Sequence, residues 1–357
     1  MFLSNILTQK YKTLGNGNYG LVISPAVNIS SFWEQVFSNT SDEIGKIYKI
    51  CNGKSYIDEV LYEYNILKCI MKIENYNTFT VSMKSICCFK LIDYIKDEYI
   101  LEKLNYDKEI NKDIVVYQIS FDYGGKSINK ITNSMSFIDS INMLIKFYKG
   151  IKTLHDNNII HRDIKPTNVL YDPIQKKLNI IDFGLYCFTD EVYNLEISDY
   201  LLKDMYIYHP PEFYLYYYLK SKNIKQFNHQ FDKEYKNVFL NPSIKLHEYY
   251  NKHFYEYNKN QDEYNIDQYI EGFKSIYNSI KNLEYVDIND VFNNEEFIYK
   301  CDIYSTYYIL IKVKKLIKFE NDEQKQLYNN LINNVKCFDP FKRFSCKQVI
   351  TFLEFML

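Results

Sequence analysis

The stretch that decides the fold spans residues 161–184 and reads HRDIKPTNVLYDPIQKKLNIIDFG. Asp163 stands five residues before Asn168, and Asp182 follows Asp163 by nineteen residues and is backed by Gly184. Two short apolar runs around a polar turn separate Asn168 from Asp182, and this pattern predicts a hairpin of two strands. A loop, a hairpin and a second loop can therefore bring the three polar side chains together at one site.

The chemistry of these side chains suits one reaction class. Carboxylate and amide oxygens are ligands for a hard cation such as Mg²⁺, and a further carboxylate can accept the proton of a hydroxyl group. Together they are typical of phosphoryl transfer. The alternative is three polar residues in unrelated turns. Seven fixed identities within HRDIKPTN, followed by a correctly spaced DFG, argue against that alternative.

HRDIKPTN followed by DFG resembles the catalytic and metal-binding loops of the eukaryotic-type protein kinases. The resemblance implies an α+β, bilobal protein kinase-like fold, with a small antiparallel β-sheet lobe and a larger, mainly α-helical lobe. It implies that Asp163 is the base and that Lys165 neutralises the transferring phosphoryl group. Asn168 and Asp182 would hold Mg²⁺, and Leu170 would pack under the adenine of ATP.

Composition sets limits on the class of protein. The chain has 357 residues, 46% of them hydrophobic, and a net charge of −2, so no global basic field points to nucleic acid. Its eight cysteines form no Cys-x-x-Cys pair, which disfavours zinc. No signal peptide and no run of about eighteen apolar residues is present. We expect an intracellular, cytoplasmic protein without a membrane partner, or one of the host cytoplasm or virion if it is viral.

A glycine-rich segment near the start is followed by the apolar run Leu21-Val22-Ile23. Glycines let backbone amides approach phosphate oxygens. A dinucleotide-binding loop would open a helix, whereas this run reads as a strand. The resemblance assigns nucleotide-covering roles to Leu14, Gly15, Asn16, Gly17, Asn18, Tyr19, Gly20 and Val22.

The next strand is predicted within residues 46–50, Lys-Ile-Tyr-Lys-Ile. Alternation along a strand points Ile47 and Lys49 to one face and Tyr48 to the other. The resemblance implies that Lys49 holds the α- and β-phosphates of ATP, while the alternative is a solvated lysine of an edge strand. The residue two before this lysine is usually a small alanine over the adenine, and here it is Ile47.

Residues 56–70 have the apolar spacing of a helix. Glu63 matches the helix glutamate that pairs with the strand lysine in protein kinases. Glu59 lies one turn earlier on the same face and is the competing choice. Either could instead be a surface charge of an amphipathic helix.

Residues 114–121 form a β-rich run that ends at Asp122-Tyr123-Gly124-Gly125. The resemblance makes this the last strand and the hinge of the first lobe. Phe121 would guard the back of the pocket, and the carbonyl of Asp122 and the amide of Gly124 would bind adenine. The first lobe is expected at residues 1–123 and the second at 124–357, together one kinase domain.

The second lobe is expected to carry an activation segment at residues 185–209, closed by a Pro-Pro-Glu sequence that ends at Glu212. Met205 stands where Ser/Thr kinases usually have threonine, which bears on the type of hydroxyl accepted. Asp302 is predicted to accept bonds from the catalytic-loop backbone, and Arg343 to form a buried ion pair with Glu212.

Residues 213–300 connect the Pro-Pro-Glu sequence to the helix expected from about residue 301. The segment is longer than such a connection needs, and we interpret it as an insertion. It is either lineage-specific padding or a docking surface for a partner. The long connection at 24–43 and this insertion give a layout similar to that of divergent kinases of large DNA viruses.

The resemblance implies a serine/threonine protein kinase that transfers the γ-phosphoryl group of ATP to protein substrates, itself open to phosphorylation in the activation segment. Lys165, two residues past Asp163, resembles the Ser/Thr branch. The main alternative is a catalytically weak or inactive kinase-fold scaffold or regulator, which Met205 and Ile47 keep open. A small-molecule kinase of the same fold is a second alternative. The sequence leaves the oligomeric state open.

Overall fold

The computed structural model divides the chain into two compact units. One comprises Met1–Gly125 with Ile181–Gly184, and the other Lys126–Ile180 with Leu185–Leu357. The structure describes residues 12–16, 20–24, 26–27, 44–48, 50–51, 54–55, 57–107, 113–185, 187–188, 208–210, 212–213, 266–280, 287 and 295–357.

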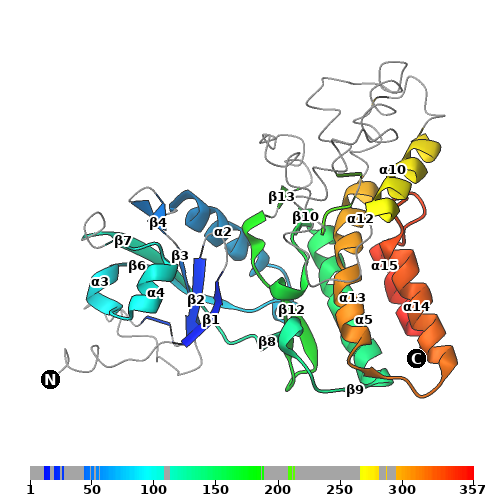
Figure 1. Ribbon diagram of the computed structural model, residues 1–357, viewed down its shortest axis with the longest axis horizontal. Coiled ribbons are helices and arrows are strands. Elements are labelled where there is room, and N and C mark those ends of the chain that lie inside the picture. The colour runs from blue at the N-terminus through cyan, green and yellow to red at the C-terminus, as the bar shows by residue number, and fades with distance from the viewer. Residues whose placement is uncertain are drawn as a thin grey trace. The chain divides into compact units, whose positions relative to one another are not determined.

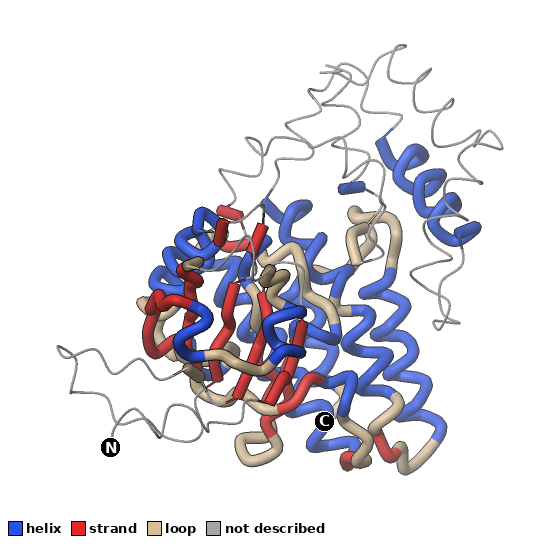
Figure 2. Tube along the Cα trace, turned by 60° about the vertical axis from the view of Figure 1, so that its left-hand side comes forward, coloured by secondary structure: helices blue, strands red, loops and turns tan. Residues whose placement is uncertain are grey.

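The first unit is built on a five-stranded antiparallel sheet, whose strands lie side by side in Figure 2. In spatial order the strands are β1 (Lys12–Asn16), β2 (Gly20–Ser24), β3 (Ile44–Tyr48), β7 (Val115–Phe121) and β6 (Met83–Lys90). β1 and β2 are directly paired, so a strand follows the glycine-rich segment, as predicted, and not the helix of a dinucleotide-binding loop.

One face of this sheet is covered by helices α3 (Leu91–Tyr94) and α4 (Glu98–Lys103). Leu21 of β2 pairs in register with Ile47 of β3, so their side chains share this face. They form one buried cluster with the two helices, which comprises Leu21, Ile23, Val27, Ile47, Phe89, Leu91, Ile95, Ile100, Leu101, Leu104 and Val116.

The opposite face turns toward helix α2 (Ile57–Ile70). Successive residues of a strand alternate between faces. Lys46 and Tyr48 therefore lie on the side opposite Ile47, and both reach Glu63 of α2. The prediction had put Ile47 and Lys49 on one face and Tyr48 on the other. The structure confirms that Ile47 and Tyr48 lie on opposite faces, with Ile47 buried at the back of the sheet by α3 and α4, and Lys49 lies outside the described residues.

Helix α4 lies in a stretch whose structure the sequence left undetermined. The Asp97 side chain accepts the backbone N–H groups of Tyr99 and Ile100, at 2.9 and 3.2 Å, and so caps the helix. Ile100, Leu101 and Leu104 then recur at helical spacing and are buried. The capping aspartate before an apolar run is the sequence signal from which this helix could have been predicted.

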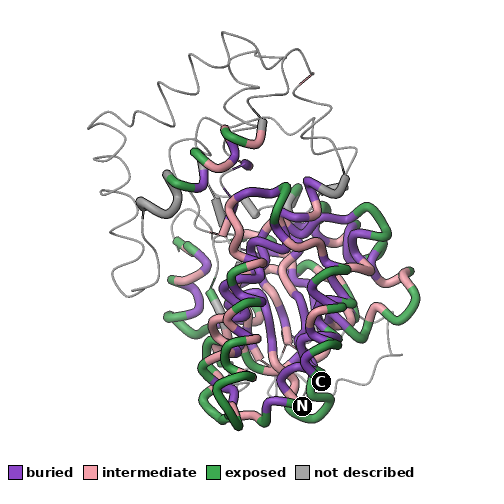
Figure 3. Tube along the Cα trace, turned by 90° about the vertical axis from the view of Figure 1, so that its right-hand side faces the viewer, coloured by how far each residue is buried: buried purple, intermediate pink, exposed green. Residues whose placement is uncertain are grey.

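The second unit is mainly helical, and its long helices run alongside one another (Figure 1). They are α5 (Phe137–Asp156), α12 (Glu295–Ser305), α13 (Tyr307–Lys314), α14 (Asp322–Lys336) and α15 (Cys346–Phe355), with α10 (Ile266–Ile280) from the predicted insertion. Ser136 caps α5, and Ser345 with Gln348 forms a capping box at α15. Buried and exposed residues alternate along these helices, so each helix has a buried face and an exposed face (Figure 3).

The predicted hairpin of residues 169–181 is present as β11 (Val169–Asp172) and β12 (Lys177–Ile180). Shorter elements complete the description: β4 (Ile50–Cys51), β5 (Lys54–Ser55), β8 (Lys126–Ser127), β9 (Met135–Ser136), β10 (Ile159–Ile160), β13 (Cys187–Phe188), β14 (Ile317–Lys318), and the 3₁₀ turns Tyr76–Thr78, Ile128–Lys130, Pro166–Asn168 and Phe183–Leu185. Within the described part of the chain, no helix has both the length and the apolar character to cross a membrane.

The Gln118 side chain of β7 hydrogen-bonds the backbone of Val27, which follows β2, and so holds this segment against the sheet. Its side-chain oxygen accepts the N–H of Val27 at 2.9 Å, and its side-chain nitrogen donates to the carbonyl of Val27 at 3.1 Å. The amide lies over Gly45, where a Cβ atom would come within 2.4 Å of the Gln118 oxygen. A side chain at position 45 would displace this amide and disturb its two bonds to Val27.

We predict that Gln118→Leu lowers the free energy of unfolding by about 2–4 kcal/mol, because it leaves two buried backbone groups of Val27 without partners. Urea unfolding at neutral pH measures this. The control is Gln175→Leu at an exposed turn, which should change the stability by less than about 0.5 kcal/mol. Equal effects of the two substitutions would contradict the role given to Gln118.

Candidate functional site

The catalytic loop predicted from the sequence is assembled within the second unit. Asp163 is buried, and its Oδ2 atom accepts two bonds, from Lys165 Nζ at 2.8 Å and from Asn168 Nδ2 at 2.8 Å. Asn168 Nδ2 also donates to the backbone carbonyl of Asp163, at 3.1 Å. One carboxylate is therefore held by both of its predicted neighbours, through charge-assisted and amide hydrogen bonds.

Asp302 of α12 fixes the backbone of this loop. Its carboxylate accepts the N–H groups of His161 and Arg162, at 2.9 and 2.8 Å, and a contact from His155 Nε2 at 3.1 Å. Burial alone would raise the pKa of Asp302, but the bonds from His155 and the loop backbone hold that pKa below its usual value. The predicted role of Asp302 is confirmed, and His155 is a partner that the sequence did not reveal.

Arg162 has a left-handed backbone, with φ of 64°. Such a conformation costs free energy for a residue with a side chain, and it persists where surrounding bonds impose it. Here Asp302 holds the Arg162 amide, and His209 Nε2 lies 2.9 Å from the Arg162 carbonyl. The strained turn lies immediately before Asp163, whose backbone position it sets.

In the first unit, Lys46 joins two carboxylates. Its Nζ atom lies 2.6 Å from Glu63 Oε2 and 2.9 Å from Asp182 Oδ1. Burial would lower the pKa of Lys46, but the charges of Glu63 and Asp182 outweigh it and hold the pKa well above its usual value. Tyr48 adds a hydroxyl bond to Glu63 Oε2 at 2.5 Å. Asp182 itself has a left-handed backbone, with φ of 65°.

This cluster differs from the predicted pairing of Glu63. Glu63 was expected to pair with Lys49, and in the structure its lysine partner is Lys46. Lys49 lies outside the described residues, as does the side chain of the competing Glu59. The physical reason is the register of β3. Val22 pairs with Lys46, and Lys46 lies on the face toward α2, where it reaches Glu63.

The remaining predicted nucleotide residues lie at several places. Five of them are on the paired strands β1 and β2, namely Leu14, Gly15, Asn16, Gly20 and Val22, whereas Gly17, Asn18 and Tyr19 lie outside the described residues. At the predicted hinge, the amide of Asp122 donates to the carbonyl of Ser82 at 3.0 Å and Gly124 is buried. Leu170 is buried on β11 in the second unit.

The predicted ion pair of Glu212 and Arg343 is confirmed. Both guanidinium Nη atoms donate to the Glu212 carboxylate, and both side chains are fully buried. Burial opposes the charge of Arg343, but the Glu212 carboxylate raises the pKa of the guanidinium. Arg343 also donates to the carbonyls of Cys337 and Lys300, at 2.7 and 3.0 Å. Met205 and most of the predicted activation segment lie outside the described residues.

The residues predicted to hold Mg²⁺ have suitable donors. Asn168 uses its amide nitrogen to bond Asp163, and its amide oxygen, which accepts a bond from Thr167 Oγ1 at 3.4 Å, is the atom that the prediction assigns to the metal. Asp182 offers a carboxylate that is partly exposed. Both are hard oxygen ligands of the kind Mg²⁺ prefers, with substrate phosphates as further ligands. Among the described residues, no group of three or more His, Cys, Asp or Glu side chains could form an all-protein metal site.

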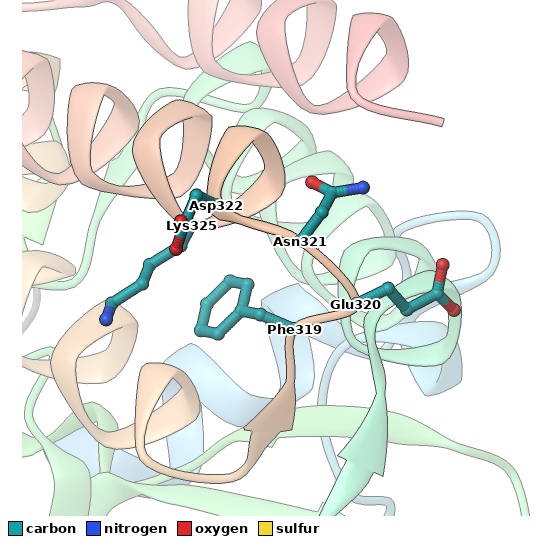
Figure 4. A pocket seen from close by; sticks show the side chains of 5 residues that line it. All are labelled: Phe319, Glu320, Asn321, Asp322 and Lys325. Atoms are coloured by element: carbon teal, nitrogen blue, oxygen red, sulfur yellow. The ribbon is translucent and has the colours of Figure 1, made fainter.

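A shallow depression lies at the start of α14 in the second unit (Figure 4). Phe319, Glu320, Asn321, Asp322 and Lys325 line it. It contains none of the predicted site residues, so it has no part in the site described above.

His209 makes stability depend on pH. Burial, together with the positive charge of Arg162, lowers the pKa of His209 to about 3. An unfolded histidine has a pKa near 6.5, so the unfolded chain binds the proton first as the pH falls. The stability that this residue contributes is therefore fully present above about pH 6.5 and is lost progressively toward pH 3.

We predict that this one residue makes the protein less stable by about 2 kcal/mol at pH 5 than at pH 7. His209→Gln removes the titrating group. The stability difference between wild type and variant, measured by urea unfolding, should therefore change by about that amount between the two pH values. A difference that does not vary with pH would contradict the buried, uncharged state of His209.

Comparisons with known proteins agree with the site. The family model described as protein kinase domain matches residues 8–353. A human cell division cycle 7-related protein kinase is 40% identical over 60 residues, which are 17% of this chain and 10% of the relative. A probable serine/threonine-protein kinase ireA of Dictyostelium discoideum is 51% identical over 43 residues, 12% of this chain and 4% of the relative.

A calcium/calmodulin-dependent protein kinase type I of Schizosaccharomyces pombe is 31% identical over 116 residues, 28% of this chain and 34% of the relative. The matched part is thus about a third or less of each of these three relatives, whereas the family model extends over nearly all of this chain. On the strength of that model and of the loop geometry, the chain belongs to the protein kinase domain family.

Proposed function

We propose that this protein transfers the γ-phosphoryl group of ATP to serine or threonine hydroxyl groups of protein substrates. The observation that carries the proposal is the bonding of Asp163, whose carboxylate is held by Lys165 and Asn168 in a loop anchored on Asp302. A base for a hydroxyl proton, a cation for phosphoryl charge and a metal ligand thus occur within six residues.

Asp163 would accept the proton of the substrate hydroxyl as the oxygen attacks the γ-phosphorus. Lys165 donates to the same carboxylate, which keeps its ammonium group beside the reacting atoms. There it would offset the negative charge that spreads over the transferring phosphoryl oxygens.

Mg²⁺ would be held by the oxygens of Asn168 and Asp182, and when bound it neutralises charge on the phosphates of ATP. Lys46, held by Glu63, would bind the α- and β-phosphates in the place first assigned to Lys49. The carbonyl of Asp122 and the amide of Gly124 would bind adenine, with apolar contacts from Leu14, Val22 and Leu170.

The preference for serine and threonine rests on Lys165, which the Ser/Thr branch shares, and on the relative whose name is a serine/threonine-protein kinase. We also propose that residues 1–123 serve as the nucleotide-covering lobe and 124–357 as the lobe with the catalytic loop. The insertion at 213–300 would be a docking surface for a protein partner, of which the described part is mainly the amphipathic helix α10.

The test is transfer of labelled phosphate from Mg²⁺·ATP to a generic basic protein, with analysis of which hydroxyl residues carry the label. We predict phosphoserine or phosphothreonine with the wild type, and a loss of about 10²–10⁴-fold in Asp163→Asn, because the proton acceptor is removed. Lys46→Met should lose about 10²-fold or more, since it removes the phosphate-binding charge.

Lys49→Met is the matched control and should retain activity within about threefold, because Lys46 makes the pair with Glu63. Thermal unfolding shows whether each variant is folded. Activity lost in Lys49→Met but kept in Lys46→Met would give the phosphate-binding role back to Lys49. Equal background in the wild type and in Asp163→Asn, with nucleotide still bound, would instead support an inactive scaffold.

A further inference from the structure

We infer that Tyr48 is a positioning residue of the nucleotide site, whose hydroxyl group sets Glu63 in place to hold Lys46. This rests on the proposed function, because it assigns the side chain that orients the phosphate-binding lysine. Nothing in the loop motifs of the sequence predicts it.

The first step is geometric. The Tyr48 hydroxyl lies 2.5 Å from Glu63 Oε2, and Lys46 Nζ lies 2.6 Å from the same oxygen. Tyr48 and Lys46 are two residues apart on β3 and so share one face of the strand. The Lys46 ammonium also lies 5.3 Å from the centre of the Tyr48 ring, within the range of a cation–π contact. Tyr48 thus touches both members of the ion pair.

The second step concerns burial. Glu63 is 3% exposed and Tyr48 is 1% exposed. A buried carboxylate without enough hydrogen bonds is costly, and it moves toward whatever donors remain. The Tyr48 hydroxyl supplies a second donor on the strand, so the Glu63 side chain is fixed from β3 by two groups. Burial raises the pKa of Tyr48, which keeps the hydroxyl protonated and able to donate.

The third step concerns competition for Lys46. Its ammonium is shared between Glu63 and Asp182, and Asp182 is also a predicted Mg²⁺ ligand. Removing the Tyr48 hydroxyl loosens Glu63 and shifts Lys46 toward Asp182. The lysine would then be misplaced for the phosphates, and the carboxylate that should bind the metal would be occupied. Tyr48 therefore favours the arrangement in which Lys46 stays on the side of Glu63.

The test is Tyr48→Phe, which keeps the ring and removes the hydroxyl. We expect kcat/KM for ATP to fall about tenfold, within the usual range for a lost hydrogen bond to a charged group, with a rise in KM accounting for much of it. In a Glu63→Gln background the same substitution should change kcat/KM by less than about twofold, because the group that Tyr48 positions is already altered.

The matched control is Tyr148→Phe in α5. Tyr148 is also fully buried, and its hydroxyl makes a 2.6 Å bond to the Thr306 side chain, within the second unit. Both tyrosine variants should lose stability, but Tyr148→Phe should change kcat/KM by less than about twofold in either background. A Tyr48→Phe effect that is small, or that adds fully to that of Glu63→Gln, would overturn the inference.

The outcome separates this inference from the proposed function. If the wild type transfers no phosphate, the proposed activity fails, and the role of Tyr48 is then read from Mg²⁺·ATP binding by calorimetry. There Tyr48→Phe should weaken binding about tenfold while Tyr148→Phe leaves it unchanged. No difference between the two variants, or no binding by the wild type, would overturn the inference.

Discussion

The charge of Lys46 is the constraint on which the first unit depends. An ammonium group out of water is tolerated where opposite charges compensate the lost hydration, and here Glu63 and Asp182 both lie within 3 Å of it. Those two partners come from α2 and from the DFG turn, far apart in sequence. Keeping the lysine charged therefore also fixes a helix and a turn against strand β3, and the proposed phosphate-binding role of Lys46 depends on that arrangement.

The two faces of the sheet that carries Lys46 have different surroundings, and this difference sets the direction of the Lys46 side chain. Leu21, Ile23 and Ile47 bury the back of the sheet beneath α3 and α4, and the residues between them turn toward α2. A register shift of one residue would exchange the faces and place a lysine in the apolar cluster. The short helices α3 and α4 thus secure the position of Lys46, although neither carries a site residue.

In the second unit the catalytic loop depends in the same way on Asp302. Its carboxylate accepts hydrogen bonds from the backbone N–H groups of His161 and Arg162, the two residues before Asp163. The sequence predicted this loop, the hairpin after it, the glycine-flanked strands and the Glu212–Arg343 pair. The loop, the hairpin and the strands are carried by motifs in which residue type and spacing are local, whereas the Glu212–Arg343 pair joins two short motifs far apart in the chain. Lys46 was not predicted, because the sequence does not distinguish it from Lys49 until it is known which face of the sheet α3 and α4 cover. Tyr48, His155 and His209 were missed because no motif links them to their partners Glu63, Asp302 and Arg162.

The most direct test of this account is a crystal structure of the protein with Mg²⁺ and a non-hydrolysable ATP analogue. The account predicts that the Lys46 ammonium contacts the α- or β-phosphate oxygens while it remains within about 3 Å of Glu63. It also predicts that the Tyr48 hydroxyl still donates to Glu63. A structure in which Lys49 occupies that place, with Lys46 turned toward α3 and α4, would contradict it.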